Sequence, residues 1–245
     1  VEQRHIPIQR ACRLFDITWA TAFICEFSST RIGIPFGDYF YTGSTVGQEL
    51  YISNIPFMDS LSFAFLLFAS YCVALVFLLP HAKIAEQRGW QFDATLRTSW
   101  PAIGLTVVFF TFSDVIIDPL ALRGDQWFLG RIYGYSEEAL YFGVPLVNFA
   151  GWAVVGLVSL FVYRWLERGL FKTESVPQEV VRRELFLGIG LFYGVLAFNL
   201  VVTFWIGEVF IGIVGCFIFT PLTAVLLVTL WRGQTLSRAH EGVTS

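Results

Sequence analysis

The sequence is poor in charged residues and very poor in histidine. Asp, Glu, Lys and Arg make up 14% of its 245 residues, whereas they make up about 25% of an ordinary soluble domain. Hydrophobic residues make up 56%. This composition excludes an ordinary soluble domain and indicates an integral membrane protein. The net charge of −3 offers no basic surface, so no nucleic-acid partner is expected.

Motifs for common cofactors are absent as well. The three histidines, His5, His81 and His240, are too few for the imidazole-rich iron centres of membrane hydroxylases and desaturases. There is no G-x-G-x-x-G after a predicted strand and no Walker A motif, so no flavin, nicotinamide or nucleotide site is indicated. The four cysteines form no C-x-x-C pair, and no disulfide or zinc framework is predicted. We therefore expect no metal and no cofactor, and any chemistry to be acid–base work by carboxyl groups.

Six stretches of the sequence are long and apolar enough to cross a membrane, which takes about 20 residues. They are Ala11–Ser28, Phe57–Pro80, Trp100–Leu122, Leu140–Trp165, Glu184–Ile206 and Glu208–Trp231. The first stretch is the least apolar, and the last two meet at a glycine that predicts a tight hairpin. The sequence thus predicts an all-α, polytopic transmembrane helical bundle that forms one integral-membrane domain over residues 1–245.

The basic residues predict the orientation of this bundle. Of the 16 Lys and Arg residues, all but Arg31, Arg123 and Arg131 fall on one side of the six predicted spans. Positive charge accumulates on the cytoplasmic side of membrane proteins. We therefore expect both termini of the chain to be cytoplasmic and the protein to lie in the cytoplasmic (inner) membrane.

A short aromatic segment, GIPFGDYFYTG, lies between the first two spans on the side with few basic residues. Its glycines and proline break a helix, and irregular backbone at membrane depth is tolerated only where protein buries it or it lines a cavity. The segment therefore predicts a re-entrant or interfacial loop that caps the bundle, with Phe36, Gly37, Asp38 and Tyr39 at its centre. The alternative is an aromatic belt at the level of the lipid head groups.

Two acidic residues lie within the apolar third span. Asp114 and Asp118 in TFSDVIIDPLAL are four residues apart and so share one helix face. Insertion of a charged residue into lipid costs about 2.5–3.5 kcal/mol, so both should face the interior of the bundle, close enough to affect each other's proton affinity. The alternative is a structural contact, either a hydrogen bond to another helix or an ion pair with Arg123 or Arg131. Pro119 is expected to kink or end the helix.

Other polar residues have two possible interpretations each. Glu26, near the outer end of the first span, is either a site residue or an interfacial acid that reaches water. Asn148 and Trp152 share a helix face in the fourth span, where the amide hydrogen-bonds either another helix or a site group. Glu208, in the predicted hairpin, is expected to contact only water.

Three segments resemble a known family when taken together and in order. TRIGIPFGDYFYT, DVIIDPLALRGDQWF and YFGVPLVNFAGW are similar to signature segments of the membrane carotenoid biosynthesis family, which includes carotenoid 1′,2′-hydratases and bisanhydrobacterioruberin hydratases. The resemblance implies an all-helical hydro-lyase that adds water across the terminal double bond of a linear carotenoid, and a further helix ahead of residue 1. Asp59 departs from the apolar helix start that the resemblance implies. The functional positions that it implies are Gly37, Asp38, Tyr39, Asp114, Asp118, Trp127, Gly143, Pro145, Asn148 and Trp152.

The acids and aromatic residues agree with the chemistry of alkene hydration. An acid must be kept protonated by an apolar site, aromatic faces stabilise the resulting cation, and an ionised carboxylate takes a proton from water. The predicted catalytic residues are Asp114, Asp118, Asp38 and Glu26. The predicted substrate-binding residues are Phe36, Gly37, Tyr39, Trp127, Tyr141, Asn148 and Trp152.

The expected partners are a linear carotenoid, the lipid bilayer and, as candidates, other membrane proteins. Two other classes of function stay open. One is a non-catalytic carotenoid-binding membrane subunit of a pigment–protein complex. The other is a small transporter or proton channel, because intramembrane acids also mark ion paths, although the sequence shows no inverted repeat to support it.

Overall fold

The computed structural model of the protein describes residues 5–78, 94–136, 139–169 and 178–241, and the described chain is mostly helical. Its long helices are α1 (His5–Ile32), α2 (Phe57–Leu78), α5 (Trp100–Ala121), α6 (Leu146–Gly169), α7 (Gln178–Trp205) and α8 (Val209–Glu241). A short helix, α4 (Ala94–Arg97), precedes α5. Five helices in the described part, α2 and α5 to α8, are long and apolar enough to cross a membrane. The predicted all-α membrane bundle is confirmed, but only five of the six predicted spans meet this criterion among the described residues, and α1, which holds the first, does not.

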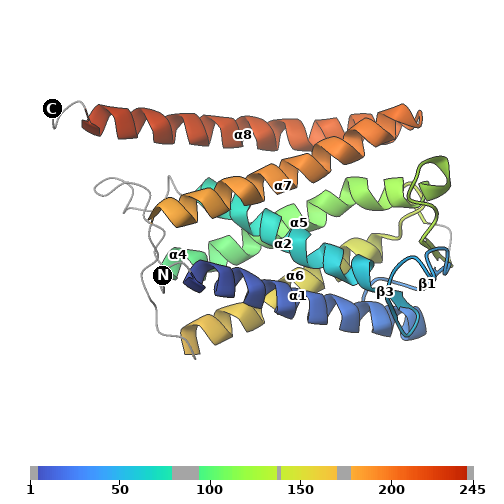
Figure 1. Ribbon diagram of the computed structural model, residues 1–245. Coiled ribbons are helices and arrows are strands. Elements are labelled where there is room, and N and C mark those ends of the chain that lie inside the picture. Colours follow the sequence, from blue (N-terminus) through green and yellow to red (C-terminus); the bar gives the residue numbers. More distant parts are fainter. Residues whose placement is uncertain (1–4, 79–93, 137–138, 170–177, 242–245) are drawn as a thin grey trace.

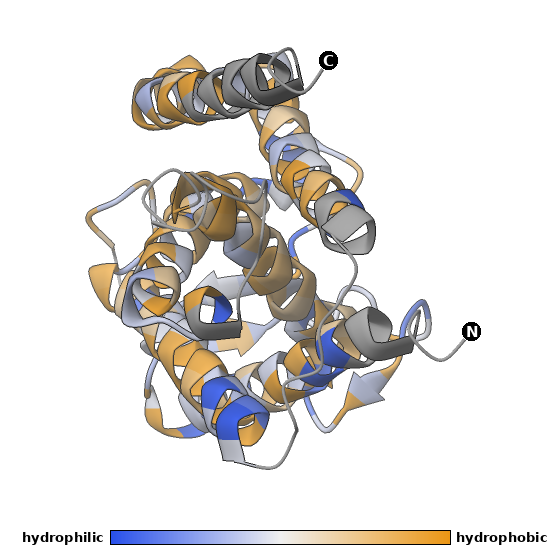
Figure 2. Ribbon diagram, turned by 90° about the vertical axis from the view of Figure 1, so that its left-hand side faces the viewer, coloured by the Kyte–Doolittle hydropathy of each residue, from blue (hydrophilic) through white to orange (hydrophobic). Residues whose placement is uncertain are grey.

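Successive long helices run in opposite directions (Figure 1), so α1 begins and α8 ends at the same end of the bundle. Helix α2 packs against α1, α5 and α7, while α6 packs against α1 and α5. Figure 2 views the bundle from the end where α1 begins and shows that hydrophobic residues make up most of its helices. Large exposed apolar side chains on α7 and α8 include Leu187, Val201, Phe210, Phe217 and Val225. These outward faces suit contact with lipid rather than water.

Helix α1 carries more charge than the other long helices, and protein contacts accommodate that charge. Near its start, Arg13 Nη1 lies 3.0 Å from Glu167 Oε1 on α6, and Arg10 Nε lies 3.5 Å from Glu167 Oε2. Near its end, Glu26 is only 1% exposed. The acid therefore faces protein rather than lipid, and α1 is able to pack along α2 and α6 despite its composition.

The helix ends match the sequence in some places and differ in others. The start of α5 is capped by Ser99, whose Oγ accepts a hydrogen bond from the Ala102 amide at 3.3 Å. Pro119 lies within the last turn of α5, which ends at Ala121. The hairpin between α7 and α8 turns at Gly207, with φ of +86°, as predicted. The last residues of the second predicted span, Leu79 and Pro80, lie outside the described residues.

The fourth span was predicted to begin at Leu140, and this was wrong. The backbone makes a tight turn in which the Val144 amide donates to the Tyr141 carbonyl at 2.8 Å, with φ of +50° at Phe142 and +92° at Gly143. Positive φ values do not belong to a right-handed helix. Helix α6 begins only at Leu146, after Pro145.

Four short strands lie at the end of the bundle opposite the start of α1 (Figure 1). Strand β1 (Tyr39–Tyr41) pairs antiparallel with β4 (Tyr133–Tyr135), so that Tyr39 lies opposite Tyr135 and Tyr41 opposite Tyr133. Strands β2 (Tyr51–Ile52) and β3 (Ile55–Pro56) form a separate hairpin. The aromatic segment after α1 lies at the end of the bundle as predicted, but part of it is a strand rather than an irregular loop.

An ion pair ties the last helical hairpin to this end of the molecule. Arg123 Nε lies 2.5 Å from Glu208 Oε1, and Arg123 Nη1 donates to the Pro119 and Phe142 carbonyls at 2.9 Å each. The expectation that Glu208 contacts only water was therefore wrong. Arg123, one of the two arginines considered as partners of Asp114 and Asp118, has Glu208 as its acidic partner.

The charge distribution and the helix directions together predict that the end with the strands faces away from the cytoplasm. A cysteine in place of Ser44 or Gln126, both exposed at that end, should react with a membrane-impermeant thiol reagent added to spheroplasts. The measurement is the fraction of protein labelled before and after lysis, with the labelling of the wild-type cysteines subtracted.

The matched control for this labelling is Gly169→Cys at the opposite end of the bundle. Gly169 is exposed, and a side chain there would meet no neighbouring atom within 4 Å. This variant should react only after lysis. Labelling of Gly169→Cys, but not of Ser44→Cys, in intact spheroplasts would invert the orientation.

Candidate active site

A cavity of about 250 Å³ lies at the end of the bundle that carries the strands. Residues of α1, α2, α5 and α6 and of the β1–β4 ribbon line it. Its polar lining consists of Glu26, Tyr39, Glu49, Asp59, Ser62, Asp118, Tyr133, Tyr135 and Asn148. Its apolar lining includes Phe36, Met58, Phe63, Ile117 and Trp152. The cavity thus combines an aromatic wall with several carboxyl groups.

Asp118 and Asp114 form the first carboxyl pair, and Asn148 on α6 joins them. Asn148 Nδ2 donates to Asp114 Oδ2 and to Asp118 Oδ2, at 2.8 Å in both cases. Asp118 also accepts hydrogen bonds from the hydroxyl of Tyr135, at 2.5 Å, and from that of Tyr133. Both acids face the protein interior, as their four-residue spacing predicted. The amide of Asn148 on α6 thus hydrogen-bonds another helix, α5, through the two acids that were predicted as site residues.

The two members of this first pair have different surroundings. Asp118 lines the cavity, whereas Asp114 is fully buried and is not part of the lining. Among the described residues, Asp114 Oδ1 has no hydrogen-bond partner. A buried acceptor without a donor costs about 1–3 kcal/mol. Asp118 is therefore the member of the pair that borders the cavity, and Asp114 lies behind it.

Glu26 and Asp59 form a second carboxyl pair, which the sequence did not reveal. The hydroxyl of Ser60 donates to Glu26, and Tyr41 Oη lies 2.6 Å from Asp59 Oδ2 and 3.1 Å from Glu26 Oε1. The Tyr41 hydroxyl thus bridges the two carboxyl groups, although it has only one proton to donate. The alternative that Glu26 reaches water at the interface was wrong, because Ser60, Tyr41 and Asp59 enclose it.

Asp59 was not predicted as a site residue, although its position in the sequence is informative. It lies in the first turn of α2, where an acidic side chain stabilises the positive end of the helix dipole. That signal favours a structural role and does not point to a partner on another helix. Only the fold shows that the first turn of α2 lies beside Glu26 of α1.

The tyrosines of the β1–β4 ribbon connect the two carboxyl pairs. Residues two apart in a strand point to the same side, and paired residues of neighbouring strands share a face. The four rings of Tyr39, Tyr41, Tyr133 and Tyr135 therefore cluster, with centroids 5.3 Å apart for Tyr39 and Tyr41 and 6.2 Å apart for Tyr39 and Tyr135. The hydroxyls of Tyr39 and Tyr41 are 3.3 Å apart.

The tyrosine hydroxyls act as hydrogen-bond donors to the acids. Burial raises the pKa of the Tyr41 hydroxyl well above its usual range, and the nearby Asp59 and Glu26 carboxyls raise it further. Burial and Asp118 raise the pKa of Tyr133 in the same way. These hydroxyls therefore keep their protons, and each donates to a carboxyl group.

Asp38 does not point into the cavity, and that prediction was wrong. It is exposed, as is Phe40, while Tyr39 between them is buried. Strand alternation explains this, because Asp38 and Phe40 point to one side of the ribbon and the tyrosines to the other. The Asp38 carboxylate instead lies over Gly33, where a side chain would overlap Asp38 Oδ1.

The aromatic residues predicted to bind substrate divide into two groups. Phe36 and Trp152 line the cavity, and both pack on Phe63, with ring centroids 5.7 Å and 4.3 Å away respectively. Trp127 and Tyr141 lie outside it. Trp127 Nε1 donates to the Leu120 carbonyl at 3.3 Å, and Tyr141 Oη donates to the Val115 carbonyl at 3.1 Å.

Two glycines make room for the aromatic wall. Gly37 has φ of +90°, and a side chain there would come within 2.9 Å of Val147 Cγ1 on α6. It does not line the cavity but sets the turn between Phe36 and Tyr39. A side chain at Gly151 would overlap the ring of Phe36. The glycine of the FAGW motif thus admits Phe36 beside α6.

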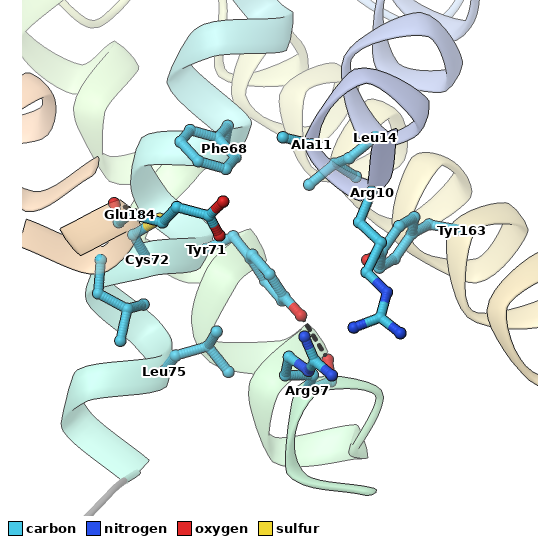
Figure 3. Close-up of a pocket in the computed structure, with 11 residues that line it drawn as sticks. Arg10, Ala11, Leu14, Phe68, Tyr71, Cys72, Leu75, Arg97, Tyr163 and Glu184 are labelled. Atoms are coloured by element: carbon cyan, nitrogen blue, oxygen red, sulfur yellow. Dashed lines mark hydrogen bonds between the residues drawn. The ribbon is translucent and has the colours of Figure 1, made fainter. Parts of the chain in front are cut away.

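A second pocket lies at the other end of the bundle (Figure 3). It has a volume of about 50 Å³, and its lining includes Arg10, Tyr71, Arg97, Tyr163 and Glu184. Tyr71 Oη donates to the Arg97 carbonyl at 2.9 Å. This pocket is much smaller than the first and has no carboxyl pair, so we place the candidate active site in the larger cavity.

Metal ligands do not cluster in the described part of the chain. Within it, no group of three or more His, Cys, Asp and Glu side chains is arranged to hold a metal ion. The carboxyl groups of the larger cavity instead have tyrosine, serine and asparagine donors as partners.

Comparison with known proteins gives matches to one class of protein. A family model described as carotenoid biosynthesis protein matches residues 2–220. The bisanhydrobacterioruberin hydratase of Haloarcula japonica is 27% identical over 175 residues, which cover 69% of this chain and 52% of that protein. The chain thus spans about half the length of this curated relative. No solved structure matches the chain.

The amide bridge between the two aspartates should be important for stability. Asn148→Leu keeps the size of the side chain but removes the donor shared by Asp114 and Asp118. Loss of donors to buried carboxyl groups costs about 1–3 kcal/mol for each group left without a partner. We expect a clear fall in the midpoint of thermal unfolding of the purified protein in detergent.

Asn199→Leu is the matched control for this measurement. Asn199 is also a buried asparagine in a long helix, but within the described residues its amide donates to the Val195 carbonyl of the same helix, at 2.8 Å, and to no other helix. This variant should shift the midpoint much less. Equal shifts for the two variants would mean that the bridge contributes nothing beyond an ordinary buried amide.

Proposed function

Because the chain belongs to the carotenoid biosynthesis protein family, we propose that it is a carotenoid hydratase. It adds water across the terminal double bond of a linear carotenoid without a cofactor, by acid–base catalysis with carboxyl groups. The name of the relative from Haloarcula japonica supports hydration as the reaction. The observation that carries the proposal is one apolar, aromatic cavity lined by members of two buried carboxyl pairs.

Each part of the cavity has a use in this reaction. Hydration of a trisubstituted alkene begins with a proton transfer to the carbon that bears a hydrogen, and this needs a carboxylic acid held in an apolar site. The tertiary cation that forms is stabilised by aromatic faces such as those of Phe63 and Trp152. Water then attacks the cation while a carboxylate accepts a proton from it.

The size and position of the cavity favour the end of a polyene over its middle. About 250 Å³ is slightly below the range of about 300–1,000 Å³ of ordinary small-molecule pockets, so only one end of a long carotenoid fits inside. Met58 lines the cavity and is 57% exposed. The rest of the bound polyene therefore extends out of the cavity past Met58, at the start of α2.

The predicted site residues take different roles in this proposal. Asp118 and Glu26 line the cavity and act on the substrate or on water. Asp114 positions Asp118 through Asn148. Phe36, Tyr39 and Trp152 contact the substrate. Gly37 shapes the turn beneath them, and Asp38 takes no part in the chemistry.

The test is the mass of the carotenoid formed in a lycopene-producing host that expresses the chain. Wild-type protein should yield carotenoid with one or two added waters. Asp118→Asn keeps the size of the side chain but removes the titrating carboxyl group, and it should lower product per inserted protein by at least about 100-fold, a typical share for acid–base catalysis.

Asp38→Asn is the control, because Asp38 is exposed on the other face of the ribbon, and it should leave the yield unchanged. Purified wild-type protein that carries unmodified carotenoid and forms no hydrated product would contradict hydration and favour a carotenoid-binding subunit. Protein that neither binds nor modifies carotenoid would contradict both.

A further inference from the structure

The two carboxyl pairs have opposite hydrogen-bonding partners. Glu26 and Asp59 share the hydroxyl of Tyr41, which lies 3.1 Å from Glu26 Oε1 and 2.6 Å from Asp59 Oδ2. That hydroxyl has one proton to donate, so a proton on one of the two carboxyl groups completes the hydrogen bonding between them. Asp118 has hydrogen bonds from Tyr133, Tyr135 and Asn148, and every one of these partners is a donor. Three donors occupy most of the acceptor sites of a carboxylate and suit its ionised form. One pair is therefore built to hold a proton, and Asp118 is built to lack one.

We propose that the Glu26–Asp59 pair is the proton donor of the hydration and that Asp118 is the base that takes a proton from water. This assignment rests on the proposed function. It adds Asp59 to the catalytic residues and gives Glu26 and Asp118 separate roles. All three side chains line the same cavity, so each can reach a substrate end placed there.

The reaction balances with these groups alone. The π electrons of the terminal double bond take the proton of the Glu26–Asp59 pair and form a C–H bond, which leaves a cation on the tertiary carbon. A lone pair of water forms the C–O bond, and the proton that this water releases goes to Asp118. A second water in the cavity returns the proton from Asp118 to the Glu26–Asp59 pair, because both border the same space.

Tyr41 is a positioning residue for the donor pair. Its hydroxyl lies 2.6 Å from Asp59 Oδ2 and 3.1 Å from Glu26 Oε1, so it fixes both carboxyl groups relative to each other. The hydroxyl of Tyr39 lies 3.3 Å from that of Tyr41, so it extends the hydrogen-bonded group formed by Tyr41, Asp59 and Glu26. Removal of the Tyr41 hydroxyl should weaken proton donation without removing the proton.

Deuterium exchange separates proton donation from water addition. The protein in its membranes is supplied with lycopene in heavy water, and deuterium is measured in the hydrated product and in the unreacted carotenoid. A cation that forms but is not captured by water can return a proton to the donor pair, which leaves deuterium at the terminal alkene carbon. Exchange without hydration is therefore the signature of an intact donor and a missing base.

The variants should divide into two classes in this experiment. Asp118→Asn should lose hydration by at least about 100-fold and still exchange deuterium into the unreacted carotenoid. Asp59→Asn and Glu26→Gln should lose both hydration and exchange. Tyr41→Phe keeps the ring and both carboxyl groups. It should lower hydration and deuterium exchange by the same factor, and it tests the donor pair without changing a buried acid. Asp38→Asn is the unchanged control.

Two results would overturn the assignment while leaving the proposed function intact. One is an Asp59→Asn protein that hydrates or exchanges like the wild type. The other is loss of exchange in Asp118→Asn together with its retention in Asp59→Asn, which would reverse the two roles. A wild-type protein that forms no hydrated carotenoid would instead contradict the proposed function itself, and the assignment with it.

Discussion

Hydrogen bonds from tyrosine hydroxyls and the Asn148 amide to buried carboxyl groups connect the separate parts of this chain. A carboxyl group inside a membrane bundle has no water to solvate it, so protein must supply donors or the group must keep a proton. Here the acids come from α1, α2 and α5, while the tyrosines come from β1 and β4. The segments that carry β1 and β4 therefore pack against the ends of these helices, where their tyrosine hydroxyls hydrogen-bond to the acids.

The same requirement explains why the least apolar helix is still part of the bundle. On hydropathy alone, α1 is a poor candidate for a membrane helix, since Arg13, Asp16 and Glu26 interrupt it. In the folded chain Glu26 is enclosed by Ser60 and Tyr41, and Arg13 pairs with Glu167. Arg13 and Glu26 thus contact neighbouring elements of the bundle, while Asp16 is exposed. A helix that carries the polar groups of a site need not be apolar if other helices surround those groups.

The sequence predicted the features that depend on local spacing. The shared face of Asp114 and Asp118 follows from a separation of four residues, and the hairpin at Gly207 follows from a glycine between two apolar runs. Pairing across long stretches of chain was not predictable. Strand β4 has only three residues, too few for a periodic pattern, so Tyr133 and Tyr135 gave no sign that they meet Asp118.

A place within a signature segment did not by itself put a residue in the cavity. Trp127 and Tyr141 lie within signature segments, yet their polar atoms bond the backbone of α5 outside the cavity. Asp38 lies in the sequence between the cavity residues Phe36 and Tyr39, yet strand geometry turns it outward. Asp59 broke the apolar pattern of its segment, and its side chain lines the cavity.

The β1–β4 ribbon makes the two halves of the site inseparable. Tyr41 on one strand serves Asp59 and Glu26, while Tyr133 and Tyr135 on the other strand serve Asp118. Because side chains alternate along a strand, a slip of one residue in this pairing would turn the tyrosines of the shifted strand away from the acids and remove the donors that they supply. Substitutions on the two strands should therefore combine non-additively. Neither half of the site is free to evolve without the other.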